Sequence, residues 1–487
     1  MPRSTCSTTP SPTDSTLTVN SGSYVTNGGN GTFSLKNSII YNVTTPGGTY
    51  PANVSVYAAG SSPFASYGGG DNYLASGSTN RDSGTTSGLD STLAADLKLR
   101  TTYAPGDSSP GGVPGTWDYV AVALPGPVLR DTGTPDRGYH YDPIDSLSTA
   151  PAIHTGDSVT LPAGYVLAAV SGRALNAAGG SLTMTGTPIS RIYVVQASSV
   201  VESSVNNPNT SALLKVAVGT TDQPFQARFC TFALQAGTQF FASEPETAPF
   251  RLDDCEIYGG GFAEHEGVQT GHSRSLTLRN NLFCRVTCDF DNGGSTGYPG
   301  LVSIPITANN NTFEACTLTL KPASPNLWTW RNNLFDLTTI TQNGNSILDG
   351  YNGYSGYTTP TRISPTSTSD VVQSAAAPFM ASTFGSFYLN QTSAFINAGS
   401  GSADANGYFF YTTSSSQILE GQSPLDIGYH YIAVSSGVPI VSNGGSGYLN
   451  DPTGSYYLNA QSIAAGTGAT QGFKVFLTRP VNGQSNP

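Results

Sequence analysis

The segment Arg279-Asn280-Asn281-Leu282-Phe283 follows a pattern that recurs along the middle of the chain: two polar residues, Asn or Cys, a variable residue and an apolar residue. The apolar residues that close its five occurrences are 25, 26, 30 and 22 residues apart. A period of about 20 to 30 residues, with short apolar strands and Gly or Asn turns, indicates a solenoid, and the absence of helical periodicity makes it a β-solenoid. The other occurrences are Arg228-Phe229-Cys230-Thr231-Phe232, Asp253-Asp254-Cys255-Glu256-Ile257, Asn309-Asn310-Asn311-Thr312-Phe313 and Arg331-Asn332-Asn333-Leu334-Phe335.

The segments that precede this repeat also have the pattern of short β-strands. Residues 156–167 and 180–188 alternate apolar and polar side chains between Gly and Pro turns, which predicts the opening strands of the solenoid. Parallel strands of one sheet are joined by right-handed crossovers. We therefore predict an all-β fold, a right-handed parallel β-helix. Residues 342–425 are looser and are expected to form irregular last coils and a cap over the terminal strand edge.

Stacked coils place equivalent side chains about 4.8 Å apart. Asn281, Asn311 and Asn333 should then form an asparagine ladder, with Cys230 and Cys255 continuing the same column. Stacked amides can hydrogen-bond along the axis and satisfy buried turn carbonyls, so we assign these residues a structural role. A disulfide between Cys230 and Cys255 is compatible with this register but is not needed, since a free Cys packs well as a small apolar residue.

A second repeat operates over a longer distance. Residues 136–141, Asp-Arg-Gly-Tyr-His-Tyr, return at 426–431 as Asp-Ile-Gly-Tyr-His-Tyr, and residues 35–40 are similar to residues 330–335, at offsets of 290 and 295. The chain is thus predicted to hold one complete β-helix unit preceded by the C-terminal part of another. The predicted boundaries are 1–145 for the last coils and cap of the first unit, 146–431 for the complete unit, and 432–487 for a strand-rich extension that starts a further module or serves assembly.

The histidines of this motif, His140 and His430, lie between two tyrosines. No acid or nucleophile repeats with them in the sequence, so we expect a structural role, with Asp136 and Asp426 bonding turn amides.

The composition excludes several classes of protein. Only 51 of 487 residues are charged, 20 basic and 31 acidic, and the formal net charge is -11. Long helices need runs of Ala, Glu, Lys, Leu and Arg that are missing here. Binding to nucleic acid or to an anionic membrane surface needs clustered Lys and Arg. The sequence contains no basic run, which disfavours both kinds of partner. No stretch approaches the roughly 18 apolar residues of a membrane span, so we expect no membrane insertion within the chain.

Taken together, these segments resemble the bacterial right-handed parallel β-helix repeat-containing proteins, which share the pectin-lyase-like superfamily fold. The resemblance covers roughly residues 33–145 and 152–431 and includes a closing signature at 385–389, 393–399 and 426–431, with Ser386 where the family usually has Asp. It implies the fold and a large secreted or cell-surface protein of bacterial type, but it says little about activity, because β-helices carry lyases, hydrolases, adhesins and passive stalks.

The densest group of ionisable residues runs from Arg251 to Arg274. Its loop residues Glu264, His265 and Glu266 are the candidate binding residues, and their carboxylates are of the kind that holds Ca²⁺. The pair Asp253-Asp254 and His272, 18 residues later, are similar to the Asp-Asp and Gly-His-Gly motifs of β-helical polygalacturonases. Paired carboxylates beside a His can support inverting glycoside hydrolysis. The other motifs of that family, and the Arg-x-Pro-x-x-Arg of pectate lyases, are missing.

Two functions therefore compete. The first is a non-enzymatic extracellular or cell-surface module, structural or adhesive, that binds itself head-to-tail in fibres or binds a surface polysaccharide and uses no cofactor other than Ca²⁺ at the loop carboxylates. Strand-prone ends at 1–50 and 432–487 motivate the filament, since heterologous contacts propagate. The second is a polysaccharide-active enzyme, a polygalacturonase-like hydrolase or a lyase, that uses Asp253, Asp254 and His272. It requires these side chains to converge in one groove.

Overall fold

The structure of the protein is a computed structural model. It describes residues 16–18, 35–43, 52–68, 70–107, 126–148, 153, 156–169, 175–178, 180–197, 200–201, 214–217, 225–233, 241–243, 250–264, 268–269, 275–291, 301–302, 304–322, 324–363, 367–433, 457–462 and 473–478.

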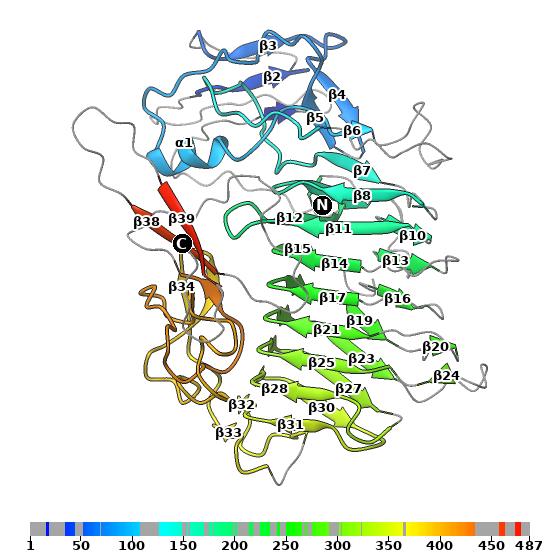
Figure 1. The fold of residues 1–487 in the computed structure, drawn as a ribbon. Helices are drawn as coiled ribbons and strands as arrows, with labels where there is room; N and C mark the ends of the chain where they lie inside the picture. The colour runs from blue at the N-terminus through cyan, green and yellow to red at the C-terminus, as the bar shows by residue number, and fades with distance from the viewer. Residues whose placement is uncertain are drawn as a thin grey trace.

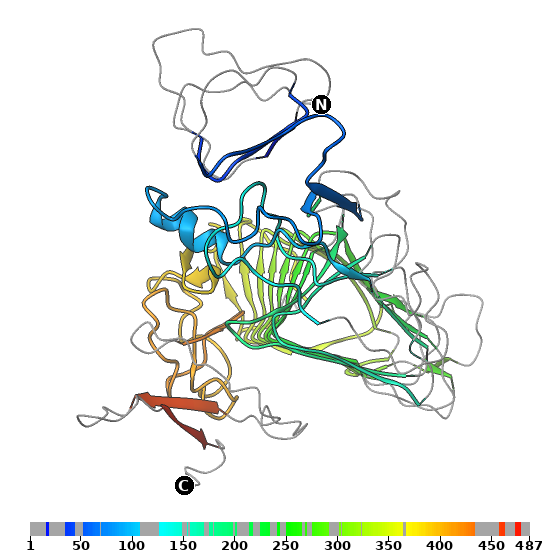
Figure 2. The same ribbon diagram turned by 90° about the horizontal axis from the view of Figure 1, so that it is seen from above.

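Most of the described chain winds into a right-handed parallel β-helix, which confirms the predicted fold class (Figure 1). Seen from above, the coils superpose along one axis (Figure 2). One face is an eight-stranded parallel sheet made of β8 (Ser158–Leu161), β11 (Ser181–Thr185), β14 (Phe225–Arg228), β17 (Phe250–Asp253), β21 (Leu276–Arg279), β25 (Ile306–Asn309), β28 (Thr329–Arg331) and β31 (Leu348–Gly350).

The second face is an eleven-stranded parallel sheet. Its strands are β6 (Gly106–Asp107), β7 (Ser146–Ser148), β9 (Val166–Ala169), β12 (Ile192–Gln196), β15 (Cys230–Ala233), β18 (Glu256–Tyr258), β22 (Leu282–Cys284), β26 (Thr312–Glu314), β29 (Leu334–Asp336), β32 (Gly353–Ser355) and β33 (Val371–Val372). The third face consists of β10 (Leu175–Ala178), β13 (Leu214–Ala217) and β16 (Phe241–Ser243), followed by β19 (Gly261–Glu264), β23 (Thr287–Asp291), β27 (Thr317–Lys321) and β30 (Thr339–Gln342). The short strands β20 (Val268–Gln269) and β24 (Leu301–Val302) pair antiparallel.

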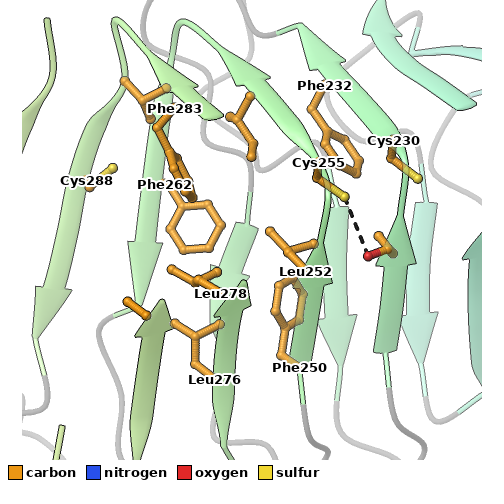
Figure 3. Close-up of a cluster of buried hydrophobic side chains, with 14 of the residues drawn as sticks. Cys230, Phe232, Phe250, Leu252, Cys255, Phe262, Leu276, Leu278, Phe283 and Cys288 are labelled. Atoms are coloured by element: carbon orange, nitrogen blue, oxygen red, sulfur yellow. Dashed lines mark hydrogen bonds between the residues drawn. The ribbon is translucent and has the colours of Figure 1, made fainter. Parts of the chain in front are cut away.

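The interior is filled by apolar side chains that stack from coil to coil. Phe313 lies between Phe283 and Phe335, with ring centroids 4.7 and 5.3 Å away, and Phe335 stacks in turn on Tyr354. Figure 3 shows the neighbouring coils, where Phe250, Leu252, Leu276 and Leu278 point into the same core. Alternation along each strand puts these residues inside and the polar ones outside.

The corner between the first and second faces is a sharp turn with one left-handed residue in each coil. Asp254, Asn280, Asn310 and Asn332 occupy this position with φ between 54° and 57°. Asn and Asp adopt this backbone conformation more readily than other non-glycine residues. This explains why the repeat places a polar residue, usually Asn, just before the ladder position. We call these four residues the corner column.

Two compact caps, each containing an antiparallel hairpin, follow coils in the chain: the first comes after β3 (Ser55–Tyr57) and the second after β33. The first cap, residues 64–141, contains β4 (Phe64–Tyr67), β5 (Gly70–Leu74) and the helix α1 (Ser91–Leu97). The second cap, residues 379–432, contains β34 (Phe379–Ser382), β35 (Gly385–Leu389), β36 (Tyr411–Thr412) and β37 (Tyr431–Ile432). It lies beside the coils, outside one corner of the helix (Figure 2).

The strands before the first cap match the coils before the second. β1 (Thr16–Thr18), β2 (Ile39–Tyr41) and β3 (Ser55–Tyr57) form a parallel sheet in which Ile39 pairs with Ser55, as Leu334 pairs with Gly353 between β29 and β32. The repeat seen in the sequence is therefore also a repeat of strand register. Beyond Ala433 the structure describes only β38 (Tyr457–Ser462) and β39 (Phe473–Thr478), which pair antiparallel.

Candidate functional site at the cap interface

The ladder residues form a continuous column of amides inside the corner. The side-chain oxygen of Asn311 accepts from the backbone N–H and the side-chain amide of Asn281, at 2.9 and 3.0 Å. Asn333 receives the same two bonds from Asn311, and Asn352, which the sequence pattern did not include, receives them from Asn333. Asn281, Asn311, Asn333 and Asn352 are each fully buried.

Each ladder amide also donates to a carbonyl in the preceding coil, and the two cysteines copy that bond. Asn311 donates to Leu278 O at 3.0 Å, and the Cys255 thiol donates to Ala227 O at 3.5 Å (Figure 3). Cys230 donates likewise to Met184 O. Both cysteines are free, and burial, the largest cause, raises the pKa of Cys255 well above its ordinary value. The thiols therefore act as small hydrogen-bond donors in the column rather than as nucleophiles.

The two charged candidates whose side chains the structure describes, Asp253 and Asp254, have different partners. Asp253, on β17, is ion-paired with Arg251. Asp254, in the corner column, is 4% exposed and accepts from Arg228 Nε and Asn280 Nδ2, both at 2.7 Å, and from the Tyr411 hydroxyl at 3.2 Å. Because Tyr411 belongs to the second cap, Asp254 is enclosed between coil and cap, where a polysaccharide cannot reach it.

Glu256 is a further carboxylate that the second cap covers. It accepts from the hydroxyls of Tyr258 and Tyr429, at 3.1 and 3.2 Å, and lies 3.5 Å from Arg191 Nη1. Burial first, and the Glu256 charge second, raise the pKa of Tyr429 well above its ordinary value, so its hydroxyl stays a neutral donor. Two carboxylates of one coil, Asp254 and Glu256, thus each pair with an arginine of an earlier coil and each receive one tyrosine hydroxyl from the cap.

The remaining candidates are only partly covered by the structure. His265, Glu266 and His272 lie outside the described residues, and of Glu264 only the backbone, in β19, is described. Within the described ranges, no group of three or more His, Cys, Asp or Glu side chains could hold a metal ion. In the same part of the chain, no helix is long and apolar enough to cross a membrane.

The Asp-x-Gly-Tyr-His-Tyr motif docks each cap onto an asparagine of the preceding coils. Gly428 N donates to Asn332 O at 2.8 Å, and Gly138 N donates to Asn37 O at 2.7 Å. Both glycines have a positive φ, 101° and 103°. A Cβ on Gly428 would lie 2.7 Å from the Thr312 hydroxyl, so the motif needs glycine at this place.

The aspartates of the motif bond turn amides, as predicted. Asp136 Oδ1 accepts from Asp82 N at 2.7 Å, and Asp426 Oδ1 accepts from Asn397 N at 2.6 Å. The tyrosines are also equivalent: Tyr141 stacks on Tyr73 and Tyr431 on Tyr388, each with ring centroids 4.1 Å apart.

The expectation that no acid accompanies the histidines was wrong. His140 Nε2 lies 2.8 Å from Asp131 Oδ2, and His430 Nε2 lies 3.7 Å from Glu420 Oε1. The sequence comparison missed this pair because the acid changes from Asp to Glu and stands nine residues before the His in one cap and ten in the other. All four side chains are buried, which keeps the role structural.

The pKa shifts of Glu420 and His430 in the second cap predict a pH dependence of its stability. Burial first, and Asp426 second, raise the pKa of Glu420 from 4.5 to about 9, whereas burial lowers the pKa of His430 from 6.5 to about 4. The Glu420 contribution is complete below pH 4.5 and is lost as the pH rises through 9. The His430 contribution falls as the pH drops from 6.5 to 4, so the two oppose each other between 4.5 and 6.5.

We therefore expect the stability of the second cap to change little between about pH 4.5 and 6.5 and to decrease from 6.5 towards 9. Glu420→Gln, which cannot ionise, should remove that decrease. Hydrogen exchange of the cap amides across this pH range measures it. A wild-type cap that gains stability above pH 6.5, or a variant with the same slope as the wild type, would contradict the assignment.

Comparison of the chain with protein-family models, with curated proteins and with solved structures finds no match. The fold assignment therefore rests on the strand topology, and any function has to be argued from the side chains.

Proposed function

We propose that this chain is a non-enzymatic structural module of an extracellular or cell-surface protein of bacterial type, in which β-helix units follow one another and each unit is closed by a cap. The fit of its fold and closing motif to bacterial β-helix repeat-containing proteins supports the proposal. The observation that carries it is the environment of Asp254: this candidate catalytic residue is buried and binds Arg228, Asn280 and the Tyr411 hydroxyl of the second cap.

The repetition of the cap supports the same function. Equivalent hydrogen bonds hold Gly138 on Asn37 and Gly428 on Asn332, and an acid lies by the motif histidine in both caps. In both caps the repeated residues hold a turn against the coils and lie buried. This is what a structural motif does, and a catalytic group would instead have to face the substrate. A β-helix unit that is repeated along the chain, with the same kind of cap at the end of each copy, is suited to a spacer or stalk, which has to be long and rigid.

The alternative, a polygalacturonase-like hydrolase or lyase, requires Asp253, Asp254 and His272 to act on one substrate. The ion pair of Asp253 with Arg251 and the burial of Asp254 count against it. Assay of the full chain for reducing ends or unsaturated products released from pectins and neutral glycans tests both functions. We expect no release, with a β-helical polygalacturonase as the positive control. Release that disappears in Asp253→Asn and His272→Ala variants would overturn the proposal.

We propose two partners for such a module: other copies of the chain, bound head-to-tail, or a surface polysaccharide. Sedimentation velocity at rising protein concentration tests the first, since a filament grows with concentration and a spacer that needs no self-contact stays monomeric. A species that is monomeric at every concentration and salt condition would remove self-assembly and leave the spacer function in place.

A further inference from the structure

The eleven-stranded sheet of the second face begins in the first cap, ahead of the complete β-helix unit. Its edge strand β6 comes from the cap, and its next strand, β7, pairs in parallel with both β6 and β9 (Figure 1). Gly106 pairs with Ser146, and Leu147 pairs with Ala168. A solenoid needs a cap at its ends, because a terminal strand otherwise exposes a row of N–H and C=O groups. The first cap therefore also covers the starting edge of the β-helix that follows it.

Asp145 is the residue at which this cap and the coils meet, and its side chain is fully buried. Its Oδ1 accepts from Val128 N at 2.9 Å and from Arg130 Nη1 at 2.7 Å, both in the cap, whereas Oδ2 accepts from Val166 N of β9 at 2.7 Å. The backbone makes the same connection, since Gly106 N donates to Asp145 O at 3.0 Å and Asp145 N donates to Val166 O at 2.9 Å. One residue thus joins two segments of the cap to the first coil, which contains β8 and β9.

Apolar packing closes the same junction. Tyr67, in β4, packs against a cluster that contains Leu147, Val166 and also Val195 of β12, so the contact extends over the first two coils. Gly68, in the turn of the cap hairpin, has a φ of 54°, and a Cβ there would overlap Leu147 Cδ1. The hairpin turn therefore lies directly against β7, and close packing of this kind restricts movement of the cap relative to the coils.

The chain between the cap and the β-helix is too short to act as a flexible linker. Three residues, 142–144, separate the end of the motif at Tyr141 from Asp145, and Ile144 is fully buried. Linkers between domains that move independently are exposed, and few contacts cross them. The cap and the first coil should therefore open together rather than one at a time.

We propose that the first cap and the first coil of the following β-helix form one cooperative unit, and that Asp145 is the positioning residue that couples them. The first cap then has two tasks: it ends one β-helix and it fixes the next one in place. This inference rests on the proposed tandem-module function, and it adds that neighbouring units are joined as a rigid rod rather than as beads on a flexible chain.

Native-state hydrogen exchange of the full chain at rising urea concentrations tests the coupling. In the wild type, the exchange rates of the Leu74 amide, in the cap, and of the amides of β9 should rise together, because one opening exposes both. Asp145→Ala removes the acceptor of Val166 N and of Arg130. We expect the Leu74 amide to exchange at least about tenfold faster in this variant, and β9, which β12 still holds, to change by less than about threefold.

Asp142→Ala is the matched control. Asp142 lies three residues before Asp145, and its side chain is 67% exposed and pairs with Arg100 at the surface. Both regions should exchange within about twofold of the wild type in this variant and stay in step with each other.

A wild-type cap that opens at lower urea than β9 would overturn the proposal, whatever the variants do. So would an Asp145→Ala chain in which cap and coil still exchange in step. Release of reducing ends from a polysaccharide would contradict the proposed function without altering this coupling, so the two failures are distinguishable.

Discussion

Replacing Asn311 by Ala should be among the most damaging single changes in this protein. The Asn311 side chain accepts two hydrogen bonds from Asn281 and donates to Leu278 O and to Asn333 Oδ1, all inside the corner. Alanine would leave buried donors and an acceptor without partners, each at about 1–3 kcal/mol. We expect a loss of about 3–5 kcal/mol in the free energy of unfolding, measured by urea denaturation.

Asn309→Ala is the matched control. Asn309 lies at the end of β25, two residues away, is partly exposed, and its side-chain oxygen has no hydrogen-bond partner. That oxygen is buried and makes no hydrogen bond to lose, so its removal should cost about 0.5 kcal/mol or less. Equal losses in the two variants would show that the ladder amides are dispensable.

The ladder is the part of the fold that the sequence predicted best, and the reason is local. A period of 22 to 30 residues, with Asn or Cys at the ladder place of each repeat, is enough to predict which side chains stack, and the residue before that place forms the left-handed corner. Asn352 escaped the pattern because Gly350 and Tyr351 stand at its two polar positions, so the segment no longer looks like the others. Its hydrogen bonds to Asn333 nevertheless continue the column.

The environment of the candidate site could not be predicted in the same way. Asp254 and Tyr411 are 157 residues apart, and their contact depends on how the second cap folds back along the coils. No periodic pattern encodes that return. Within the charged cluster that stood out against a weakly charged background, Asp254 and Glu256 accept from tyrosine hydroxyls of the cap, a use that the sequence pattern did not indicate.

Asp254→Ala tests that conclusion with the second of the large effects. The substitution removes the acceptor of Arg228, whose guanidinium lies beneath the cap and also donates to the Tyr411 hydroxyl at 3.1 Å. Removing one partner of a fully buried ion pair typically costs about 3–5 kcal/mol. Asp254 is buried but the Arg228 side chain is 28% exposed, so we expect a smaller loss, about 2–3 kcal/mol, from the broken charged hydrogen bonds. Asn280 Nδ2 loses one of its two acceptors as well and keeps only His430 O. We expect faster hydrogen exchange across residues 400–433 and earlier proteolysis of the cap, while the coil around Val159 in β8, two strands from β14 in the same sheet, stays protected.

Asp253→Ala, at the neighbouring residue, separates the structural role from a catalytic one. Asp253 pairs with Arg251 on a surface where both side chains retain some exposure, 15% and 28%, so its loss should cost about 1 kcal/mol or less and leave the cap closed. A catalytic pair would respond alike, with activity lost and the cap intact in both variants. If the role is structural the two variants must differ, because Asp254, unlike Asp253, accepts from both Asn280 of the corner column and the Tyr411 hydroxyl of the cap.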